Sequence, residues 1–399
     1  MADVADGADL GRVVEHLPLV DHHCHGVRTD VLDRAGFEAL ISEGGAPAPG
    51  LTNFDTPVGM AIRRHCAPVL GLPAHAPGDA YVERRAELGA GEVNRRFLAA
   101  TGTAAFGVDT GFRPDGLTTP AELAELAGSG TAHEIVRLEA VAEAVAADGV
   151  EPDGLADAVA ARLSAALAAG AIGFKTVAAY RAGLDVDPAP PSAADVTAAA
   201  GAWLAAGPGA GGWRLADPLL TRMLLGLAVD LGRPVQVHIG FGDSDIRMHR
   251  ADPSRLTDWL HTHRVPVMLL HCWPFHRQAA YLAAVHPHAY LDLGLTMTYV
   301  AGRATALLEE AMEIAPFGKL LYSSDAFGVA EFHHLGALTF RHALGEVLAA
   351  RVSSGEWPAA DAARVAALVG WGNACRVYGL PHPAGTSRAS DPPDRPDAR

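Results

Sequence analysis

The chain has 399 residues, of which 49% are hydrophobic, and it carries a formal net charge of −15. That apolar content supplies a sizeable core and argues against global disorder, while the negative charge argues against a surface that binds nucleic acid or an anionic membrane. The acidic N-terminus, the lack of an apolar run of bilayer length and four cysteines without CxxC spacing predict a cytoplasmic protein with no signal peptide, membrane span or disulfide framework.

Short apolar runs alternate with longer segments rich in Ala and Leu, and this pattern predicts alternating strands and helices. Eight strands are expected, at residues 17–24, 104–111, 134–140, 172–178, 234–240, 265–272, 289–295 and 319–326. Gly170 and Gly232 are expected to end two of the helices between them, and Asp217 followed by Pro218 to begin the second. Eight such units with apolar strands favour a closed (β/α)8 TIM barrel over an open sheet.

Three regions depart from the alternation. Residues 27–103 contain helix-like pieces with Pro and Gly breaks, and we expect a helical insertion after the first strand that lies over the barrel mouth. Two extra C-terminal helices are expected at about 332–355 and 358–378. The prediction is therefore a single distorted barrel domain over residues 1–380, followed by a disordered, Pro-rich and charged tail at 381–399.

Several expected strands end on a residue that does not belong in an apolar core. Six such residues stand out: His23, His25, Lys175, His238, His271 and Asp325. In a TIM barrel the C-terminal ends of the strands meet at one mouth, where active sites lie. Positions i and i+2 of a strand share a face, so His23 and His25 can reach the same ion. The pattern predicts a metal site rather than a set of core histidines.

Three of these residues have more than one possible role. Lys175 is either paired to a carboxylate at the rim or, because burial lowers a lysine pKa, carboxylated by carbon dioxide to give an anionic ligand that bridges two cations. His271 is either a ligand of a second metal or, as a non-ligand, a general acid or an oxyanion stabiliser. Asp325 is expected to bind metal and to take the proton of the attacking water, with a helix N-cap as the alternative.

Candidate substrate-binding residues lie just beyond the strands. Tyr180 and Arg181 follow the fourth strand, where an arginine could clamp a substrate carboxylate, although an ordinary surface loop is the alternative. His276 follows the sixth strand and is either a substrate-binding residue or a surface residue. The histidine ligands need partners that orient them, and the candidates for that role are Asp21, Asp243 and Asp245.

The chain resembles the metal-dependent amidohydrolase superfamily. The resemblance rests on the runs PLVDHHCH, GFKTVAAYRAGL, VHIGFGDSD, LLHCWPFHRQAAYLA and LLYSSDA. They are most similar to the amidohydrolase-2-like branch, which includes the amidohydrolase half of glutamine synthetase-like fusion proteins. The resemblance implies a distorted barrel with one or two divalent ions, most often zinc, with manganese or iron as alternatives, and the lysine at position 175 favours two. It implies that His23, His25 and Asp325 hold one ion, and that carboxylated Lys175, His238 and His271 hold the other.

The resemblance also implies a reaction on a small-molecule substrate. We expect hydrolysis of an amide-type C–N bond, in which a metal-activated hydroxide attacks and Asp325 passes the proton to the leaving amine. The fusion relatives favour a γ-glutamyl amide. The alternative enzyme is a mononuclear decarboxylase or an isomerase that acts on a carboxylated substrate, with His271 as acid. A non-catalytic assembly module is a further alternative, and the sequence leaves open whether the chain forms a homo-oligomer.

Overall fold

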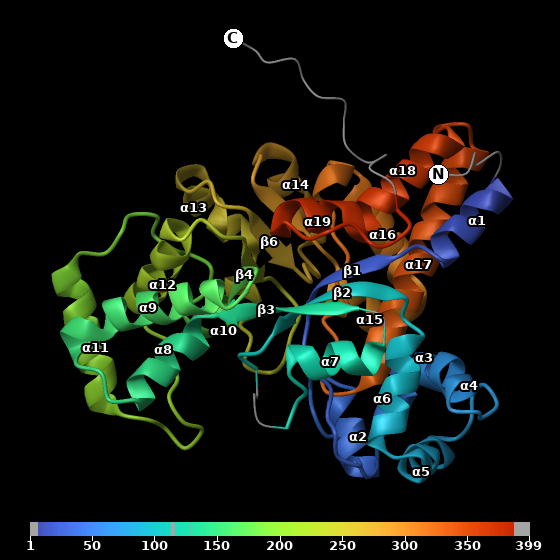
Figure 1. The fold of residues 1–399 in the computed structure, drawn as a ribbon, viewed down its shortest axis with the longest axis horizontal. Helices are drawn as coiled ribbons and strands as arrows, with labels where there is room; N and C mark the ends of the chain where they lie inside the picture. The colour runs from blue at the N-terminus through green and yellow to red at the C-terminus, as the bar shows by residue number, and fades with distance from the viewer. Residues whose placement is uncertain (1–6, 113–115, 129, 387–399) are drawn as a thin grey trace.

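The computed structural model describes residues 7–112, 116–128 and 130–386 (Figure 1). Its sheet contains seven parallel strands, each paired with the next strand along the chain. The strands are β1 (Leu19–Cys24), β2 (Thr103–Asp109), β3 (Thr131–Arg137), β4 (Gly173–Thr176), β5 (Val235–His238), β6 (Val267–Leu270) and β7 (Ala289–Leu291). Of the expected disordered tail, residues 387–399 lie outside the described residues.

The expected eighth strand at 319–326 is not a regular strand, and this part of the prediction is wrong. The segment still closes the ring of strands: Leu320 forms a parallel bridge with Leu291 of β7. On its other side, the backbone N–H of Asp325 donates to the carbonyl of His23 on β1 at 3.0 Å. Asp325 adopts φ = 48°, a left-handed conformation that interrupts the extended backbone a strand requires. The fold is therefore a distorted (β/α)8 barrel.

The third expected strand, 134–140, is also misplaced. The strand β3 ends at Arg137, and the helix α8 (Leu138–Ala147) starts at the next residue. Glu139 lies in the first turn of that helix and accepts hydrogen bonds from Thr176 Oγ1 at 2.5 Å and from the N–H of Val177 at 3.1 Å. These contacts with the end of β4 fix the boundary, and they are tertiary contacts that a local apolar pattern does not reveal.

Helices surround the sheet, and local signals set several of their ends. Asp217 accepts hydrogen bonds from the N–H groups of Leu219 and Leu220, which caps the helix that begins at Pro218, as predicted. Besides α8, the helices outside the insertion are α1 (Gly7–Glu15), α7 (Pro120–Ala127), α9 (Leu155–Ala168), α10 (Ala178–Arg181), α11 (Ala193–Ala206), α12 (Pro218–Asp230), α13 (Thr257–Thr262), α14 (His276–Val285), α15 (Gly294–Val300), α16 (Ala304–Met312), α17 (Ala330–Ser353), α18 (Ala359–Ala367) and α19 (Asn373–Tyr378). Short 3₁₀ turns lie at 53–55, 152–154, 248–250, 253–256, 301–303 and 317–319. Among the described residues, no helix is both long enough and apolar enough to cross a bilayer.

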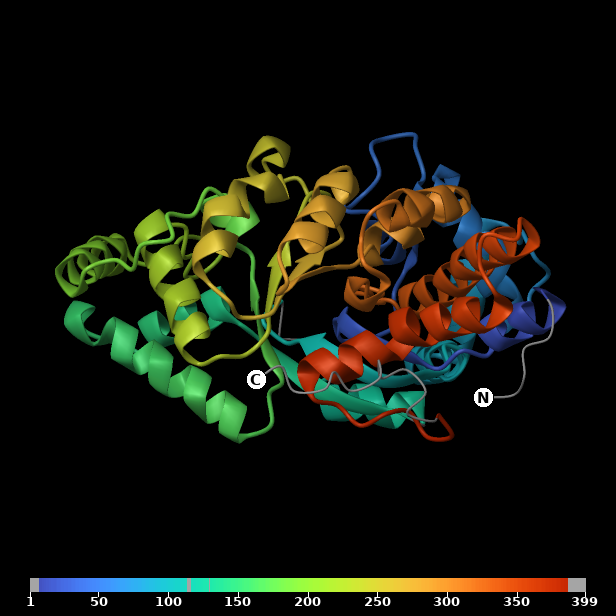
Figure 2. The same cartoon turned by 90° about the horizontal axis from the view of Figure 1, so that it is seen from above.

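The segment after β1 forms a helical unit with its own apolar core. It consists of α2 (Arg34–Leu40), α3 (Pro57–Ala61), the π-helical turn η2 (Ile62–Cys66), α4 (Ala67–Val69), α5 (Gly78–Leu88) and α6 (Ala90–Ala99). Both views place it beside α17, at the opposite end from α9 and α11 (Figure 1, Figure 2). A buried ion pair joins α5 to α17, because Arg85 Nε lies 2.6 Å from Glu331 Oε1. Tyr81 donates to the same carboxylate at 2.7 Å.

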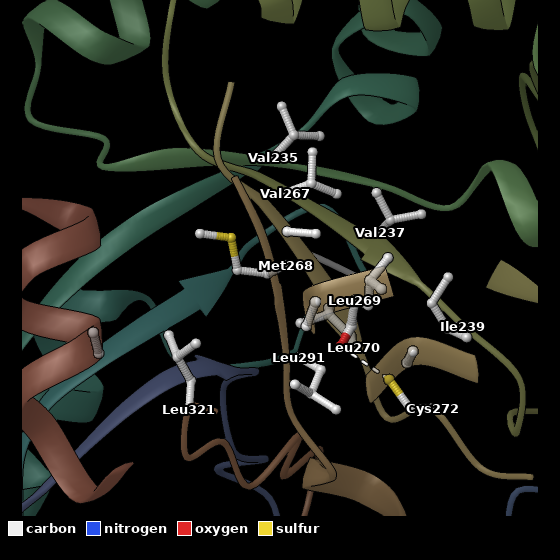
Figure 3. Close-up of a cluster of buried hydrophobic side chains, with 14 of the residues drawn as sticks. Val235, Val237, Ile239, Val267, Met268, Leu269, Leu270, Cys272, Leu291 and Leu321 are labelled. Carbon is white, nitrogen blue, oxygen red and sulfur yellow. Dashed lines mark hydrogen bonds between the residues drawn. The ribbon is translucent and has the colours of Figure 1, made fainter. Parts of the chain in front are cut away.

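The main core fills the space between the sheet and the outer helices. Val235 of β5 and Val267 of β6 are paired in the sheet, are fully buried and lie side by side (Figure 3). Cys272 follows β6, and its thiol donates to the carbonyl of Leu269 at 3.1 Å (Figure 3). All four cysteines of the chain are free and buried. The strands are thus largely covered by apolar groups, and polar side chains such as Lys175 and His238 lie toward their C-terminal ends.

Candidate metal centre

Three of the predicted ligands converge where β1 meets the segment that closes the barrel. Oδ1 of Asp325 lies 2.9 Å from Nε2 of His23 and 3.3 Å from Nε2 of His25. The ligand atoms of the three residues all lie within 4.8 Å of one another. His23 is fully buried, and the Asp325 side chain is 11% exposed. Two imidazoles and a carboxylate directed at one point match the ligand types and spacing of a divalent-cation site.

Hydrogen bonds on the far side of each imidazole set its tautomer. Nδ1 of His23 lies 2.7 Å from Oε1 of Gln236, and Nδ1 of His25 lies 3.0 Å from the backbone carbonyl oxygen of Asp109. Both oxygens can only accept, so each Nδ1 carries the proton and donates it. Each Nε2 therefore keeps its lone pair, directed toward Asp325. Metal-binding histidines commonly require this arrangement.

Gln236 is a functional residue that the sequence analysis missed. Its amide is held in one orientation, because Nε2 donates to the carbonyl of His22 at 2.7 Å and to Tyr378 Oη at 2.8 Å. The signal that could have revealed it is the period of a strand. Gln236 lies two positions before His238 on an otherwise apolar strand, so the two side chains share the inward face.

Lys175, His238 and His271 form a second group beside the first. Nζ of Lys175 lies 3.3 Å from Nε2 of His23, and Nε2 of His271 lies 3.4 Å from Oδ2 of Asp325. The ring centroids of His238 and His271 are 4.6 Å apart. All three side chains are buried. The six predicted ligands are therefore brought together at one place, at the C-terminal ends of strands or just beyond them.

Burial controls the charges in this cluster. Loss of water contact lowers the pKa of Lys175 to about 8, of His23 to about 3 and of His271 to about 4. Burial alone would raise the pKa of Asp325, but the neighbouring His271 and His23 outweigh it and hold that pKa well below its usual range. Neutral imidazoles next to an ionised carboxylate are the donor set that binds a divalent cation.

Unpaired nitrogen atoms provide a test of whether these residues fit a metal. Within the described part of the chain, Nε2 of His238 and Nδ1 of His271 are buried without a hydrogen-bond partner. A buried polar atom left unpaired costs about 1–3 kcal/mol, and a bound cation would remove that cost at a ligand nitrogen. Together with the fixed tautomers of His23 and His25, this shows that the residues present fit a divalent cation.

Two of the candidate ligands have strained backbones. His271 has φ = 68° and Asp325 has φ = 48°, values that non-glycine residues seldom adopt. The conformation of His271 is held from outside, because its N–H donates to Oδ1 of Asp292 at 2.9 Å and its carbonyl accepts from Thr296 Oγ1 at 3.1 Å. Asp292 also accepts from His22 Nε2 at 2.8 Å. Sequence reasoning missed Asp292 as well, although it is a buried acid directly after β7.

A cavity of about 390 Å³ lies over these ligands. Tyr180 and Arg181 both line it, as the sequence suggested, and the ring of Tyr180 lies 4.5 Å from that of His238. Arg181 Nη2 lies 3.4 Å from Glu143 Oε1, while its buried Nε and Nη1 have no hydrogen-bond partner among the described residues. The size is typical of a small-molecule site, and an arginine in the wall suits an anionic group.

His276 is not brought to this cavity. It begins α14, and its Nε2 lies 2.6 Å from Oε2 of Glu310 on α16. The side chain therefore joins two outer helices. His276 is close to His271 in the sequence, which is why a substrate-binding role was predicted for it. The turn between β6 and α14 separates the two side chains in the structure.

The acids expected to orient the histidines have other contacts. Asp21 accepts from the N–H of Ser324 at 2.9 Å and from its hydroxyl at 2.5 Å. Asp243 and Asp245 line the cavity, and Asp245 lies 3.1 Å from Arg214. The acceptors that actually face His23 and His25 are the Gln236 amide and the carbonyl of Asp109 described above.

A second group of metal-ligand types lies nearby. Ligand atoms of Asp21, Cys24 and His333 are also within 4.8 Å of one another. All three residues are fully buried and none lines the cavity. The carboxylate of Asp21 is already engaged by Ser324. This group does not reach the place where a substrate could bind.

Comparisons with known proteins show the family to which the chain belongs. A family model described as amidohydrolase matches residues 20–380. The chain is 28% identical to Protein fluG of Emericella nidulans over 411 aligned residues, which cover 94% of this chain and 47% of fluG. The chain thus spans about half the length of that curated relative.

Solved structures share the fold. A Lactobacillus casei protein provisionally assigned as a metal-dependent hydrolase is 27% identical, with a TM-score of 0.78 over 93% of this chain and 97% of that one. The glucuronate isomerase of Caulobacter crescentus is 16% identical, with a TM-score of 0.64 over 98% of each chain. At that identity the likeness concerns the fold alone.

Proposed function

The chain belongs to the amidohydrolase family, and on this basis we propose that it is a metal-dependent enzyme that hydrolyses an amide-type C–N bond in a small molecule. The observation that carries the proposal is the pair of adjacent ligand groups at the base of one cavity. His23, His25 and Asp325 converge in the first group, and Lys175 lies 3.3 Å from His23 in the second. An enzyme of this superfamily with such a site has the means to activate water beside a bound carbonyl group.

We propose that each ligand group holds one divalent cation, with zinc the first to test and manganese or iron as alternatives. His23, His25 and Asp325 would hold one ion. His238, His271 and a carboxylated Lys175 would hold the other. Such ions supply Lewis acidity, which polarises a carbonyl group and acidifies water. The pKa of about 8 leaves part of the Lys175 population uncharged at neutral pH, and only the neutral amine can react with carbon dioxide.

The chain's own groups then have separate tasks. Asp325 is ionised and directed at the centre of the site, so it accepts the proton of the attacking water. Arg181 lines the cavity and would hold a substrate carboxylate, with Tyr180 beside it. A γ-glutamyl amide carries such a carboxylate at a distance from its amide bond. It is therefore the substrate class that we propose to test first.

The reaction is tested on protein loaded with zinc or manganese. Release of amine or ammonia is measured with a panel of γ-glutamyl amides and other carboxylated amides. Wild type should release amine, and Asp325→Asn should be slower by roughly 10²–10⁴-fold, the usual contribution of a positioned proton acceptor. Metal-loaded wild type that releases no amine, yet releases carbon dioxide from carboxylic acids or interconverts sugar acids, would show that the reaction is a decarboxylation or an isomerisation instead.

The metal centre is tested separately by metal content and native mass. Wild type should hold two ions and the added mass of one carbon dioxide, while Lys175→Ala should lose the added mass and one ion. The chain contains only two lysines, so Lys319→Ala is a complete matched control. Lys319 donates to the carbonyls of Ala283 and His286, and its replacement should leave ions and added mass unchanged. One ion with no added mass in wild type would contradict the binuclear site.

A further inference from the structure

An acidic side chain from the helical insertion reaches the cavity and has no role in the proposal above. Glu43 lies shortly after α2 and lines the same cavity as His25 and Asp325. Tyr299 on α15 donates its hydroxyl to Oε1 of Glu43 at 3.3 Å. Among the described residues, Glu43 has no ion-pair partner. It is thus a carboxyl group that faces the reaction space without a cation to hold its charge.

The surroundings of Glu43 favour its neutral form. Burial is the largest cause, and the negative charges of Asp325 and Asp243 add to it, so that the pKa of Glu43 is raised to about 7. The hydrogen bond from Tyr299 acts in the opposite direction. Cations at the metal centre would cancel the contribution of Asp325 and lower this pKa, while burial and Asp243 would still raise it. The fourth titratable group beside Glu43 is the Tyr180 hydroxyl, which is neutral because its own pKa is raised well above 10.

We propose that Glu43 is the acid that protonates the leaving nitrogen during C–N cleavage, an inference that rests on the hydrolysis proposed above. An amine leaves poorly as an anion, so the nitrogen must gain a proton as the bond breaks. Glu43 faces the cavity from the insertion, whereas Asp325 lies among the metal ligands on the barrel side. The two carboxyl groups can therefore act on different atoms of the same bound amide.

The protons and bonds balance. Water adds its oxygen to the carbonyl carbon and gives one proton to Asp325. The C–N bond breaks as the Glu43 carboxyl gives its proton to nitrogen, and the products are a carboxylic acid and a neutral amine. Asp325 is then protonated and Glu43 ionised, and one proton passes through solvent from Asp325 to Glu43 to restore both. An acid with a pKa near the working pH is suited to this task.

The other polar groups at this part of the cavity are less suited. The hydroxyls of Tyr299 and Tyr180 have pKa values raised well above 10, mainly by burial, so they give up a proton reluctantly. Asp325 has a pKa held well below its usual range. Asp245 is paired with Arg214 at 3.1 Å. Glu43 lies on the cavity wall, and its carboxyl group holds a proton that it can give up near neutral pH.

A pair of substrates with different leaving groups tests this role in the metal-loaded enzyme. γ-Glutamyl ethylamide releases a strongly basic amine that needs a proton, whereas γ-glutamyl 4-nitroanilide releases a weakly basic one that needs it much less. Glu43→Gln should lower kcat for the ethylamide by roughly 10²–10⁴-fold and should change kcat for the nitroanilide far less. Asp245→Asn, a cavity acid with a cation partner, is the matched control and should affect both substrates alike.

A pH profile provides a readout that a structural role would not change. With the ethylamide, wild-type kcat/KM should fall as pH rises through the pKa of Glu43, which burial raises above its ordinary value, because Glu43 loses its proton. Tyr299→Phe removes the hydrogen bond that lowers the pKa of Glu43, so this limb should move to higher pH. In Glu43→Gln the limb should vanish.

The outcomes separate the two proposals. If wild type cleaves neither substrate, the proposed hydrolysis fails and the role of Glu43 falls with it. If wild type cleaves both and Glu43→Gln slows them equally, or raises only KM, then hydrolysis stands and Glu43 is not the acid. An unchanged pH limb in Glu43→Gln would overturn the inference in the same way.

Discussion

Gln236→Leu should weaken metal binding, because it removes the acceptor that fixes the tautomer of His23. Leucine nearly matches glutamine in volume, so the main loss is three hydrogen bonds. These bonds join Gln236 to His23 Nδ1 at 2.7 Å, to the carbonyl of His22 at 2.7 Å and to Tyr378 Oη at 2.8 Å. The His23 N–H would be left buried without a partner. Loss of such an outer contact of a histidine ligand typically costs 10–100-fold in metal affinity.

The same substitution should also lower the free energy of unfolding. An orphaned buried N–H costs about 1–3 kcal/mol, and each of the two other lost hydrogen bonds about 0.5–1.5 kcal/mol. We therefore expect a total loss of about 2–6 kcal/mol in the metal-free protein. Metal affinity is measured by competition with a chromophoric chelator, and stability by urea unfolding of the metal-free protein.

Tyr378→Phe is the control that separates the two effects. The Tyr378 hydroxyl contacts Gln236 at 2.8 Å and Nδ1 of His22 at 3.0 Å, but it does not contact His23. This variant should lose stability and keep its metal affinity. The reasoning would be refuted if Gln236→Leu bound metal as tightly as wild type, or if Tyr378→Phe weakened metal binding as much as Gln236→Leu.

Two further predictions concern the cavity wall and the strand below the metal site. At Gly242 an added Cβ would lie 1.8 Å from Tyr180 Oη and 3.0 Å from His238 Nε2. Gly242→Ala should therefore displace Tyr180 and lower kcat/KM by roughly 10²-fold with the fold intact. Unchanged kinetics in a folded variant would show that Tyr180 does not position substrate. Burial raises the pKa of Asp21 from 3.8 to about 7, so the folded state holds this proton more tightly than the unfolded state does. The resulting stability is present below pH 4 and is lost as pH rises to 7, with a total loss of about 4 kcal/mol. In urea unfolding of the metal-free protein, Asp21→Asn should reduce the decline between pH 5 and pH 8, to which Glu43 with its raised pKa also contributes, and an equal decline in both proteins would contradict this origin.

Much of the fold follows from local signals in the sequence. The cap formed by Asp217 before Pro218 depends on residues that are adjacent in the chain, and it was predictable for that reason. The two errors have tertiary causes. The boundary between β3 and α8 depends on bonds from Glu139 to the end of β4, and the bend in the closing segment depends on the left-handed backbone of Asp325. An apolar pattern reports which residues are buried, and it does not report where a backbone leaves the extended conformation.

The metal ligands could be predicted because a barrel brings the C-terminal ends of its strands together. Strand ends far apart in the sequence meet at one mouth, so a polar residue after an apolar strand indicates a site residue. His276 shows the limit of closeness in sequence: five positions after His271, it already contacts Glu310 on an outer helix. The two-residue period of a strand could have identified Gln236, but it could not have identified Glu43. No regular spacing links a residue in an irregular insertion to a barrel strand.

Metal binding and substrate choice depend on different parts of the chain. The ligands lie at the ends of buried strands, where partners such as Gln236 and Asp292 fix them. Tyr180 and Arg181 lie on the short helix α10, and Glu43 lies in the insertion, all outside the sheet. Changes in these outer segments can reshape the cavity without moving the ligands. A barrel of this kind can therefore keep one metal centre while its substrate changes, and that is why the reaction must be argued from the cavity wall as well as from the ligands.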